Sequence, residues 1–426
     1  VLLLAAYLGG GGIYLFVRNR WGGAEAMVAG VAWSFSPYML FLEPHGRGEV
    51  AETLAIGISP VLFWAFDRVR RDGWGIHVGV AALTLAALVF SHPLTALVAY
   101  GFLLVLLLWE FLITPLLGGK SAAGGVGRQL SAVALSVALG LGMSALYWLP
   151  AGLEREAVRM DYYGQGHYDF HRHFIQLGEL VAPPIWTDTG AAFPEFRFSL
   201  GTVQIGLGML GALTVFQRRL RRSDTLLFTL GLVGAMYMMT AASQGVWEMI
   251  PPMRYFQFPM RFLGLAGLAL VPLCGMAVRW ASLLRWKWVS RAAPAAAIGA
   301  LLWAALPLTY PPEWVDFGPV STARYHAEEL QGKWFGTTCC HDFLPEGVEY
   351  VPLPEAVVTE QYLAGELPVE KFDRGALPGD VSIDVLQSGP QHDLLRVDSA
   401  EGFDLKLFRF FFPGWMATID GENMSV

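Results

Sequence analysis

Long apolar stretches alternate with short polar segments over most of the chain. About twenty consecutive apolar residues are needed for a helix to cross the hydrocarbon core of a bilayer. Stretches near this length therefore predict a mainly α, polytopic membrane helix bundle over residues 1–310, with about ten spans. The ten stretches are 1–17, 24–42, 51–67, 74–91, 93–117, 129–150, 202–217, 225–242, 259–278 and 292–310.

The pattern changes after residue 310, where charged residues become common and no apolar run is long enough to span a membrane. Val381–Leu386 alternates between apolar and polar residues, and two further short apolar runs follow at Asp393–Val397 and Leu405–Phe412. Turn residues separate these runs. Short strands at such spacing predict a β-sandwich-like domain over residues 311–426.

Composition supports the membrane assignment. Of the 426 residues, 54% are hydrophobic and only 15% are charged, whereas soluble domains carry about 25% charged residues. The net charge of −7 adds little. The three cysteines, Cys274 and the neighbours Cys339 and Cys340, make no disulfide framework; adjacent cysteines bond each other only with strain, so unpaired thiols are expected. Because Val1 lies within an apolar run and Val426 within a strand-like pattern, we interpret the chain as a fragment.

Basic residues predict the orientation. Clusters follow the first, third, fifth, seventh and ninth stretches, and alternation of ten spans would place all five clusters on one side. The positive-inside rule makes that side the cytoplasm. The loops 43–50, 151–201 and 243–258 and the domain 311–426 are then expected outside the cytoplasm. The clusters are Arg18 and Arg20; Arg68, Arg70 and Arg71; Lys120 and Arg128; Arg218, Arg219, Arg221 and Arg222; and Arg279, Arg285, Lys287 and Arg291.

The first candidate site lies between the second and third stretches. Charged groups at membrane depth are costly and usually face a cavity, a partner or the interface. Pro44, Gly46 and Gly48 are expected to break the helix, and Glu49 and Glu52 to share a face of the next helix, whose first N–H groups could bind an anion. The charged or titratable residues of this stretch are Glu43, His45, Arg47, Glu49 and Glu52.

Two residues elsewhere are candidates for the same cavity. His92, in the tight turn between two stretches, is either a structural donor or a neighbour of Arg47. Arg261, at the start of the ninth stretch, either extends to the interface or binds a phosphate.

Two other segments carry unusual residues. Residues 167–173 read HYDFHRH, a possible metal site, although no second ligand pair stands at a familiar spacing and an interfacial aromatic segment is the preferred interpretation. Gly9–Gly12 is four consecutive glycines; close helix packing is preferred over an unwound spot.

Several segments resemble, in the same order, a bacterial integral-membrane family labelled "6-pyruvoyl-tetrahydropterin synthase-related", and more distantly YfhO-type membrane proteins. The chain departs from the family's usual pattern at CCHD, residues 339–342, which puts a role for that acidic position in doubt. Pterin chemistry is excluded because no zinc-binding histidine triad on a soluble scaffold is present. The matching segments are SPY at 36–38, RGEVAE at 47–52, SHPLTAL at 91–97, YWLPAGLE at 147–154, HFIQLGELVAPPIW at 173–186, FQFPMRFL at 256–263, GTTCCHDFLPEGV at 336–348 and FFPGWMATIDGE at 411–422.

The resemblance implies a GT-C-like glycosyltransferase of the bacterial cytoplasmic membrane, with an external cavity, a polyprenyl-phosphate-linked sugar donor, a glycan or protein acceptor, and no nucleic-acid partner. In that group the general base is an Asp or Glu of the first external loop, which would precede Val1 here. No cofactor is implied beyond a possible divalent cation. The external β-domain would position the acceptor or act as a shielding module.

Roles follow from the chemistry of a departing lipid phosphate, because cations near it stabilise its developing charge. Arg47 is the first candidate, with His45, His92 and Arg261 as further donor-binding groups. Glu52 or Glu49 would orient Arg47, bind a sugar hydroxyl or hold the cation; alternatively, Glu52 is only a structural ion-pair partner of Arg47. The residues expected to line the cavity are Glu43, Tyr38, Glu154, His173 and Arg254.

Two other functions stay open. A transporter or flippase of lipid-linked saccharides should show internal repeats with paired broken helices, and no convincing repeat is present. A non-catalytic envelope assembly protein would use the external domain to bind its partners.

Overall fold

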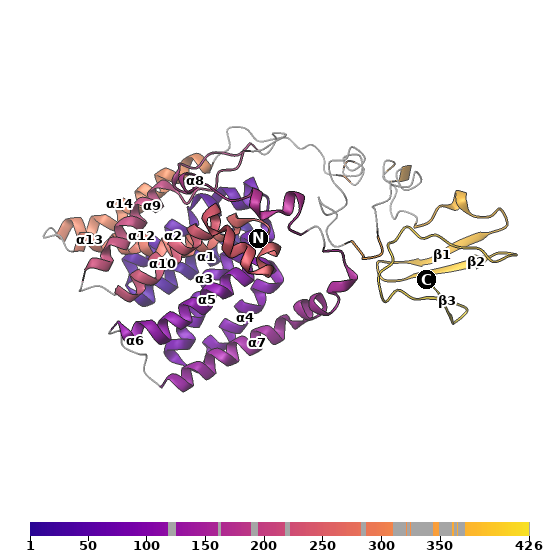
Figure 1. Ribbon diagram of the computed structural model, residues 1–426, viewed down its shortest axis with the longest axis horizontal. Coiled ribbons are helices and arrows are strands. Elements are labelled where there is room, and N and C mark those ends of the chain that lie inside the picture. Colours follow the sequence, from indigo (N-terminus) through magenta and orange to yellow (C-terminus); the bar gives the residue numbers. More distant parts are fainter. Residues whose placement is uncertain are drawn as a thin grey trace. The chain divides into compact units, whose positions relative to one another are not determined.

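The computed structural model divides into two compact units, one formed by Val1–Gly152 and Asp161–Val315 and the other by Leu153–Met160 and Asp316–Val426. The first is helical and the second contains the strands (Figure 1). The structure describes residues 1–117, 125–160, 163–188, 195–217, 222–282, 287–309, 344–348 and 371–425, with single positions at 321, 324, 360, 361 and 364. Cys339 and Cys340 lie outside the described residues.

Long helices build the first unit (Figure 1). The α-helices are α1 Leu2–Arg20, α2 Gly23–Ser34, α3 Val50–Asp72, α4 Ile76–Ser91, α5 Pro93–Leu108, α6 Thr114–Leu116, α7 Val126–Leu153, α8 Leu177–Val181, α9 Thr202–Ala212, α10 Arg222–Met239, α11 Gln244–Met249, α12 Phe262–Ala277, α13 Arg279–Ser282 and α14 Lys287–Ala305. Two π-helical segments are η1 Tyr38–Gly46 and η2 Trp109–Ile113. The 3-10 turns are η3 Arg155–Ala157, η4 Gly166–Tyr168, η5 Phe170–Arg172, η6 Leu213–Phe216, η7 Ala241–Ser243, η8 Pro251–Phe256, η9 Pro259–Arg261, η10 Leu306–Leu308 and η11 Arg374–Ala376.

The helical, membrane-protein character is confirmed, but the count of ten spans is not. Each predicted stretch contains helix, yet six helices of the described chain are long and apolar enough to cross a bilayer, or seven if α10 and α11, bent by 89° to each other, form one span. The apolar helices α4 and α9, the latter counted with η6, are shorter. The six are Leu2–Arg20, Val50–Asp72, Pro93–Leu116, Val126–Leu153, Pro259–Ala281 and Lys287–Leu308.

One predicted span is interrupted. The predicted span 24–42 does not form one continuous helix, because α2 ends at Ser34 and the π-helical η1 follows. The apolar count alone gave the wrong length here, because polar and proline-containing segments also take up helical turns. The connection 243–258, expected between two spans, contains the short helical segments α11 and η8.

Glycines allow α1 to contact its neighbours closely. A Cβ atom at Gly12 would lie 2.7 Å from the backbone nitrogen of Val61 in α3, and one at Gly57 would lie 2.7 Å from the Cα of Ala5 in α1. A Cβ at Gly9 would overlap the indole of Trp33. The backbones of α1 and α3 therefore touch, as small residues permit between membrane helices.

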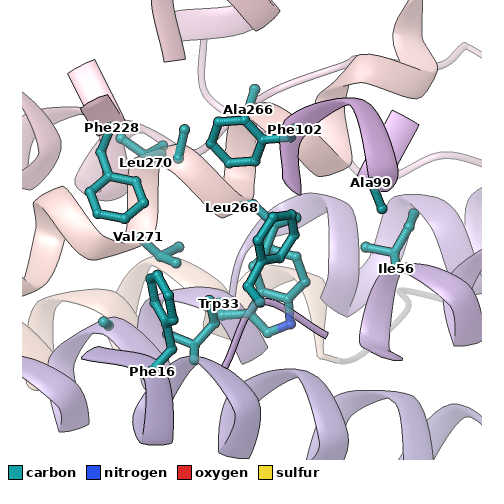
Figure 2. Close-up of a cluster of buried hydrophobic side chains, with 14 of the residues drawn as sticks. Phe16, Trp33, Ile56, Ala99, Phe102, Phe228, Ala266, Leu268, Leu270 and Val271 are labelled. Carbon is teal, nitrogen blue, oxygen red and sulfur yellow. The ribbon is translucent and has the colours of Figure 1, made fainter. Parts of the chain in front are cut away.

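The core of the first unit lies where α1, α3, α5, α10 and α12 meet. Phe16, Phe102, Phe228 and Leu268 point toward one another there (Figure 2). The hollow between these side chains has a volume of only about 10 Å³. A hollow of this volume holds no more than about one water, so the side chains around it are closely packed.

The second unit contains two antiparallel hairpins among its described residues. In the first, β1 (Ser382–Ser388) pairs with β2 (Asp393–Asp398), with a bulge between Val385 and Gln387. In the second, β3 (Ala417–Ile419) pairs with β4 (Glu422–Met424). The predicted strands near 381–386 and 393–397 are thus present, whereas the β-sandwich is not confirmed.

The predicted strand Leu405–Phe412 is wrong. It has strand-type composition but forms no ladder with the described residues, and its Phe408 N–H donates to the carbonyl of Lys371 at 2.6 Å instead. Strand propensity reflects the fit to paired neighbours more than an intrinsic backbone preference, so an unpaired segment need not become a strand.

Candidate functional site

A π-helical turn positions the first members of the site. In η1 the N–H of Arg47 donates to the carbonyl of Leu42 at 2.8 Å, five residues back. Pro44, expected to break the helix, lies inside this turn, where its missing N–H removes one bond of the ladder. Glu43 and His45 therefore belong to a helical turn and not to a loop. Single π-turns are frequent at functional sites.

Arg47 holds two buried carboxylates. Its Nη1 atom donates to both oxygens of Glu43, at 2.8 and 2.6 Å, and to Oε2 of Glu52 in α3 at 3.3 Å. The side chains of Glu43 and Glu52 are fully buried, and that of Arg47 is 10% exposed. Within the described part of the chain, the Nη2 atom has only a loose contact, 4.0 Å from Glu49. One edge of the guanidinium is thus fixed while the other is weakly held.

Two more helices bring basic groups to the same carboxylate. Arg261, at the start of the span that includes α12, places its Nε atom 3.8 Å from Oε2 of Glu52. His92, between α4 and α5, interacts electrostatically with Glu52, Arg261 and Arg47. We call Glu43, Arg47, Glu52, His92 and Arg261 the Arg47 cluster. The sequence-predicted residues Arg47, Glu52, Arg261 and His92, far apart in the chain, therefore lie together.

The hydrogen bonds and charges around His92 determine the role of its Nδ1 atom and the direction of its pKa shift. Its Nδ1 atom accepts the N–H of Thr95 at 3.2 Å and lies 2.8 Å from the Thr95 hydroxyl, so it caps α5. Burial lowers the pKa of His92, and the positive charges of Arg261 and Arg47 act in the same direction against Glu52. His92 was expected to be either a structural donor or a neighbour of Arg47. Its Nδ1 is instead a structural acceptor for Thr95, and it also interacts with Arg47.

The two glutamates of the cluster affect each other. Burial, reinforced by the neighbouring Glu52 carboxylate, raises the pKa of Glu43 to about 8, although Arg47 opposes this shift. The phenol of buried Tyr38 lies in the field of both carboxylates.

Among the described residues, Oε1 of Glu52 and Nε of Arg261 are buried without a hydrogen-bond partner. Such atoms are uncommon in folded proteins and indicate a place for water or a ligand.

An aromatic group packs beside Arg261. Its guanidinium lies 5.4 Å from the ring centre of Phe258, which in turn contacts the rings of His173 and His167 at 4.8 and 5.4 Å. The preceding residue, Gln257, is buried with a φ of 61°. A non-glycine residue in this region is strained, and such strain gathers at functional sites.

Other predicted site residues lie elsewhere. Glu49 precedes α3 with a side chain 46% exposed, so it does not share a face with buried Glu52. His45 is exposed and stacks on Phe41. Arg254 is exposed and covers the ring of Tyr255. Glu154 is exposed and belongs to the second unit.

Among the described residues, no group of three or more His, Cys, Asp or Glu side chains is arranged so that it could hold a metal ion. In the HYDFHRH segment, His171 pairs instead with Asp169 and Glu248, at 2.5 and 3.2 Å. His173 lies 2.7 Å from the carbonyl of His167.

Sequence reasoning missed a second charged group. Arg20 at the end of α1 binds Asp67 of α3, Glu110 of η2 and Asp224 of α10, at 2.6, 2.7 and 3.0 Å. Arg70 joins Asp67 and Glu110, and Arg71 joins Asp67. We call these residues the Arg20 network. Its arginines had been explained by the positive-inside rule, and the signal overlooked was Asp67 and Glu110, single acids next to apolar runs.

The fold and the two buried ion clusters define a polytopic helical membrane protein. The chain belongs to a family of unknown function, DUF6541, whose family model matches residues 5–358. No curated protein matches the sequence.

Proposed function

We propose that the protein is a GT-C-type membrane glycosyltransferase, which moves a sugar from a polyprenyl-phosphate donor to a glycan or protein acceptor at the outer face of the bacterial cytoplasmic membrane. The proposal rests on one observation, the convergence of Arg47, Arg261 and His92 on buried Glu52. Positive groups such as the two guanidiniums, fixed in advance around a developing phosphate charge, contribute most to catalysis in a dry site. His92, whose pKa is lowered, would join them as an uncharged polar group.

The geometry supports a division of work within the Arg47 cluster. Glu43 and Glu52 fix one edge of the Arg47 guanidinium. The guanidinium is therefore oriented before a ligand binds. Among the described residues, the other edge has only the loose contact with Glu49, which a phosphate oxygen could replace with two short charge-assisted hydrogen bonds. Arg47 would then bind the lipid phosphate, Glu52 would hold both arginines in place, and the base would come from outside this cluster.

Transport of lipid-linked saccharides is the second candidate. The observation that favours it is the 89° bend between α10 and α11, since transporters build their sites from broken helices. Translocation in proteoliposomes without formation of a glycosidic bond would support this function over transfer.

The test compares two arginines that each pair with an acid four residues away. Arg47 pairs with Glu43, and Arg68 pairs with Asp72 at 2.7 Å near the other end of α3. The full-length protein in nanodiscs is supplied with a panel of radiolabelled polyprenyl-phosphate hexoses and pentoses and a membrane extract as acceptor. We expect Arg47→Ala to reduce transfer roughly 100-fold, and Arg68→Ala to change it less than about twofold because its ion pair is at the surface.

A second readout covers the case in which Arg47→Ala merely loses its fold. Undecaprenyl phosphate should raise the melting temperature of the wild type and of Arg68→Ala, while a folded Arg47→Ala should show little shift. Normal transfer by a folded Arg47→Ala would overturn the proposal, as would the absence of transfer with every donor in the panel.

A further inference from the structure

The second unit contains a cavity that the proposed transfer reaction does not use. Its volume is about 420 Å³, within the range of small-molecule sites. The walls come from β1, β2, the segment from Lys371 to Arg374, and Leu407. The bulge in β1 between Val385 and Gln387 lies in this wall, and bulges often redirect side chains next to binding sites.

One end of the cavity is a hydrogen-bonded polar group. Lys371 donates from Nζ to Oδ1 of Asp393 at 2.6 Å and to the carbonyl of Gly389 at 2.7 Å. Arg409 pairs with the other oxygen of Asp393 at 3.2 Å and packs over the ring of Trp415. Burial opposes ionisation of Asp393, but the hydrogen bonds from Lys371 and Ser388 outweigh it and hold its pKa below the usual range. These polar atoms are therefore fixed before any ligand arrives.

The remaining wall is apolar. Phe372 and Ile383 are almost fully buried, at 2% and 3% exposure, and Leu395 and Leu407 complete the surface. Arg374 lies over the ring of Phe372 and donates to the carbonyl of Ile383 at 2.9 Å. The cavity thus joins an apolar face to a limited number of oriented donors and acceptors.

The charges of the described lining residues balance. Lys371 and Arg374 are cationic, and Asp384 and Asp393 are anionic. Arg409 pairs with Asp393 but is not a lining residue, so it adds one positive charge next to the cavity and not in its wall. A site for a phosphate or a uronate would need an excess of positive charge, and an amine would need the reverse. Donors and acceptors side by side suit hydroxyl groups, since each hydroxyl both donates and accepts.

We propose that this cavity binds a neutral saccharide, whose hydroxyl groups bond to Asp393, Lys371 and Ser388 while its C–H face packs on the apolar wall. The binding itself does not depend on the proposed transferase activity. The further statement that the bound saccharide is the acceptor does rest on that proposed function.

The test uses the full chain in nanodiscs and isothermal titration with named hexasaccharides. The neutral probes are maltohexaose, cellohexaose, α-1,6-mannohexaose and chitohexaose, and hexagalacturonate is the anionic probe. We expect at least one neutral probe to bind with a saturable isotherm and hexagalacturonate to bind at least tenfold more weakly. Asp393→Asn should weaken the neutral probe at least tenfold. The matched control is Asp398→Asn, the same change on the same strand at an exposed position that is not among the described lining residues.

A second variant protects the test against misfolding of Asp393→Asn. Val385 lines the cavity yet is 42% exposed, so Val385→Trp should fill the space without touching the ion pairs and abolish binding. Failure of all four neutral probes, preference for hexagalacturonate, or wild-type binding by Val385→Trp would overturn the inference. Stabilisation by undecaprenyl phosphate would be unaffected in each case, so this failure is distinguishable from failure of the transferase proposal.

Discussion

The Arg47 cluster and the Arg20 network lie at opposite ends of the same two helices. Glu52 and Asp67 are both in α3, 15 residues apart, which corresponds to about 22 Å along the helix. His92 precedes α5, and Glu110 follows its other end in η2. Each group also takes one glutamate from a π-helical turn, Glu43 from η1 and Glu110 from η2. The two charged groups are thus built from the same helices and from equivalent π-helical glutamates, yet they differ in their contacts.

The difference lies in how completely the arginine is bound. Arg20 has three carboxylates within 3.0 Å and a side chain 1% exposed. Arg47 has one close partner in Glu43, more distant contacts with Glu52 and Glu49, and 10% exposure. A buried cation whose two Nη atoms both have close carboxylates joins helices, whereas one with a weakly held Nη2 retains the capacity to bind an anion. We therefore assign stability to the Arg20 network and ligand binding to the Arg47 cluster.

The largest expected effect is from Arg20→Met. It would remove the cation that Asp67, Glu110 and Asp224 share and leave Arg70 and Arg71 to offset Asp67 and Glu110. Breaking such a buried set costs about 3–5 kcal/mol. The thermal unfolding of purified protein in detergent measures this cost. Arg47→Met, the same change at the other end, should destabilise the protein clearly less. An equal loss of thermal stability in the two variants would remove the distinction between the Arg20 network and the Arg47 cluster.

Glu43→Gln should change how stability depends on pH. The carboxyl group loses its proton at about pH 4.5 when unfolded but keeps it to about pH 8 when folded. The folded state thus holds the extra proton in this window, so the wild type loses stability as pH rises through it. The Gln side chain does not titrate. Between pH 5 and 8.5, the free energy of unfolding of the variant should therefore rise relative to that of the wild type by up to a few kcal/mol. A melting-temperature difference that does not vary with pH would contradict this.

The smallest expected effect is from Gln257→Gly, beside the Arg47 cluster. Glycine adopts a φ of 61° without steric cost, so the free energy of unfolding should change by less than about 1 kcal/mol. Gln257→Val should cost more, because a β-branched side chain is an outlier at positive φ. Equal melting temperatures for the two variants would show that the strain is not significant.

The sequence predicted the helices and the members of the Arg47 cluster where the length of the apolar stretches and the positions of the charged residues agreed. Each predicted apolar stretch contains helix, and the choice of Arg47, Glu52, His92 and Arg261 as one group corresponds to their position in the structure. Their common feature was a charged or polar residue at the same predicted side of successive apolar stretches. Alternation alone brings such residues to one end of a bundle.

The features that the sequence did not predict depend on contacts between distant segments, which the pattern of residues along one chain does not reveal. Arg20 was interpreted by its side of the membrane, and only the packing of α1, α3 and α10 reveals its carboxylate partners. Leu405–Phe412 had the residues of a strand but pairs with no strand among the described residues. The π-turn η1 could not be anticipated because proline normally ends an α-helix.

The wider turn of η1 also makes chain length critical at this position. Each residue of an α-helix turns the backbone by about 100°, so loss of one residue between Ser36 and Arg47 would rotate the guanidinium away from Glu52 even though every side chain remained. Single-residue deletions and insertions should therefore be far less tolerated here than in the exposed segment around Gly166. Among related chains, the spacing from Pro37 to Arg47 would be kept more strictly than the apolar residues that fill it.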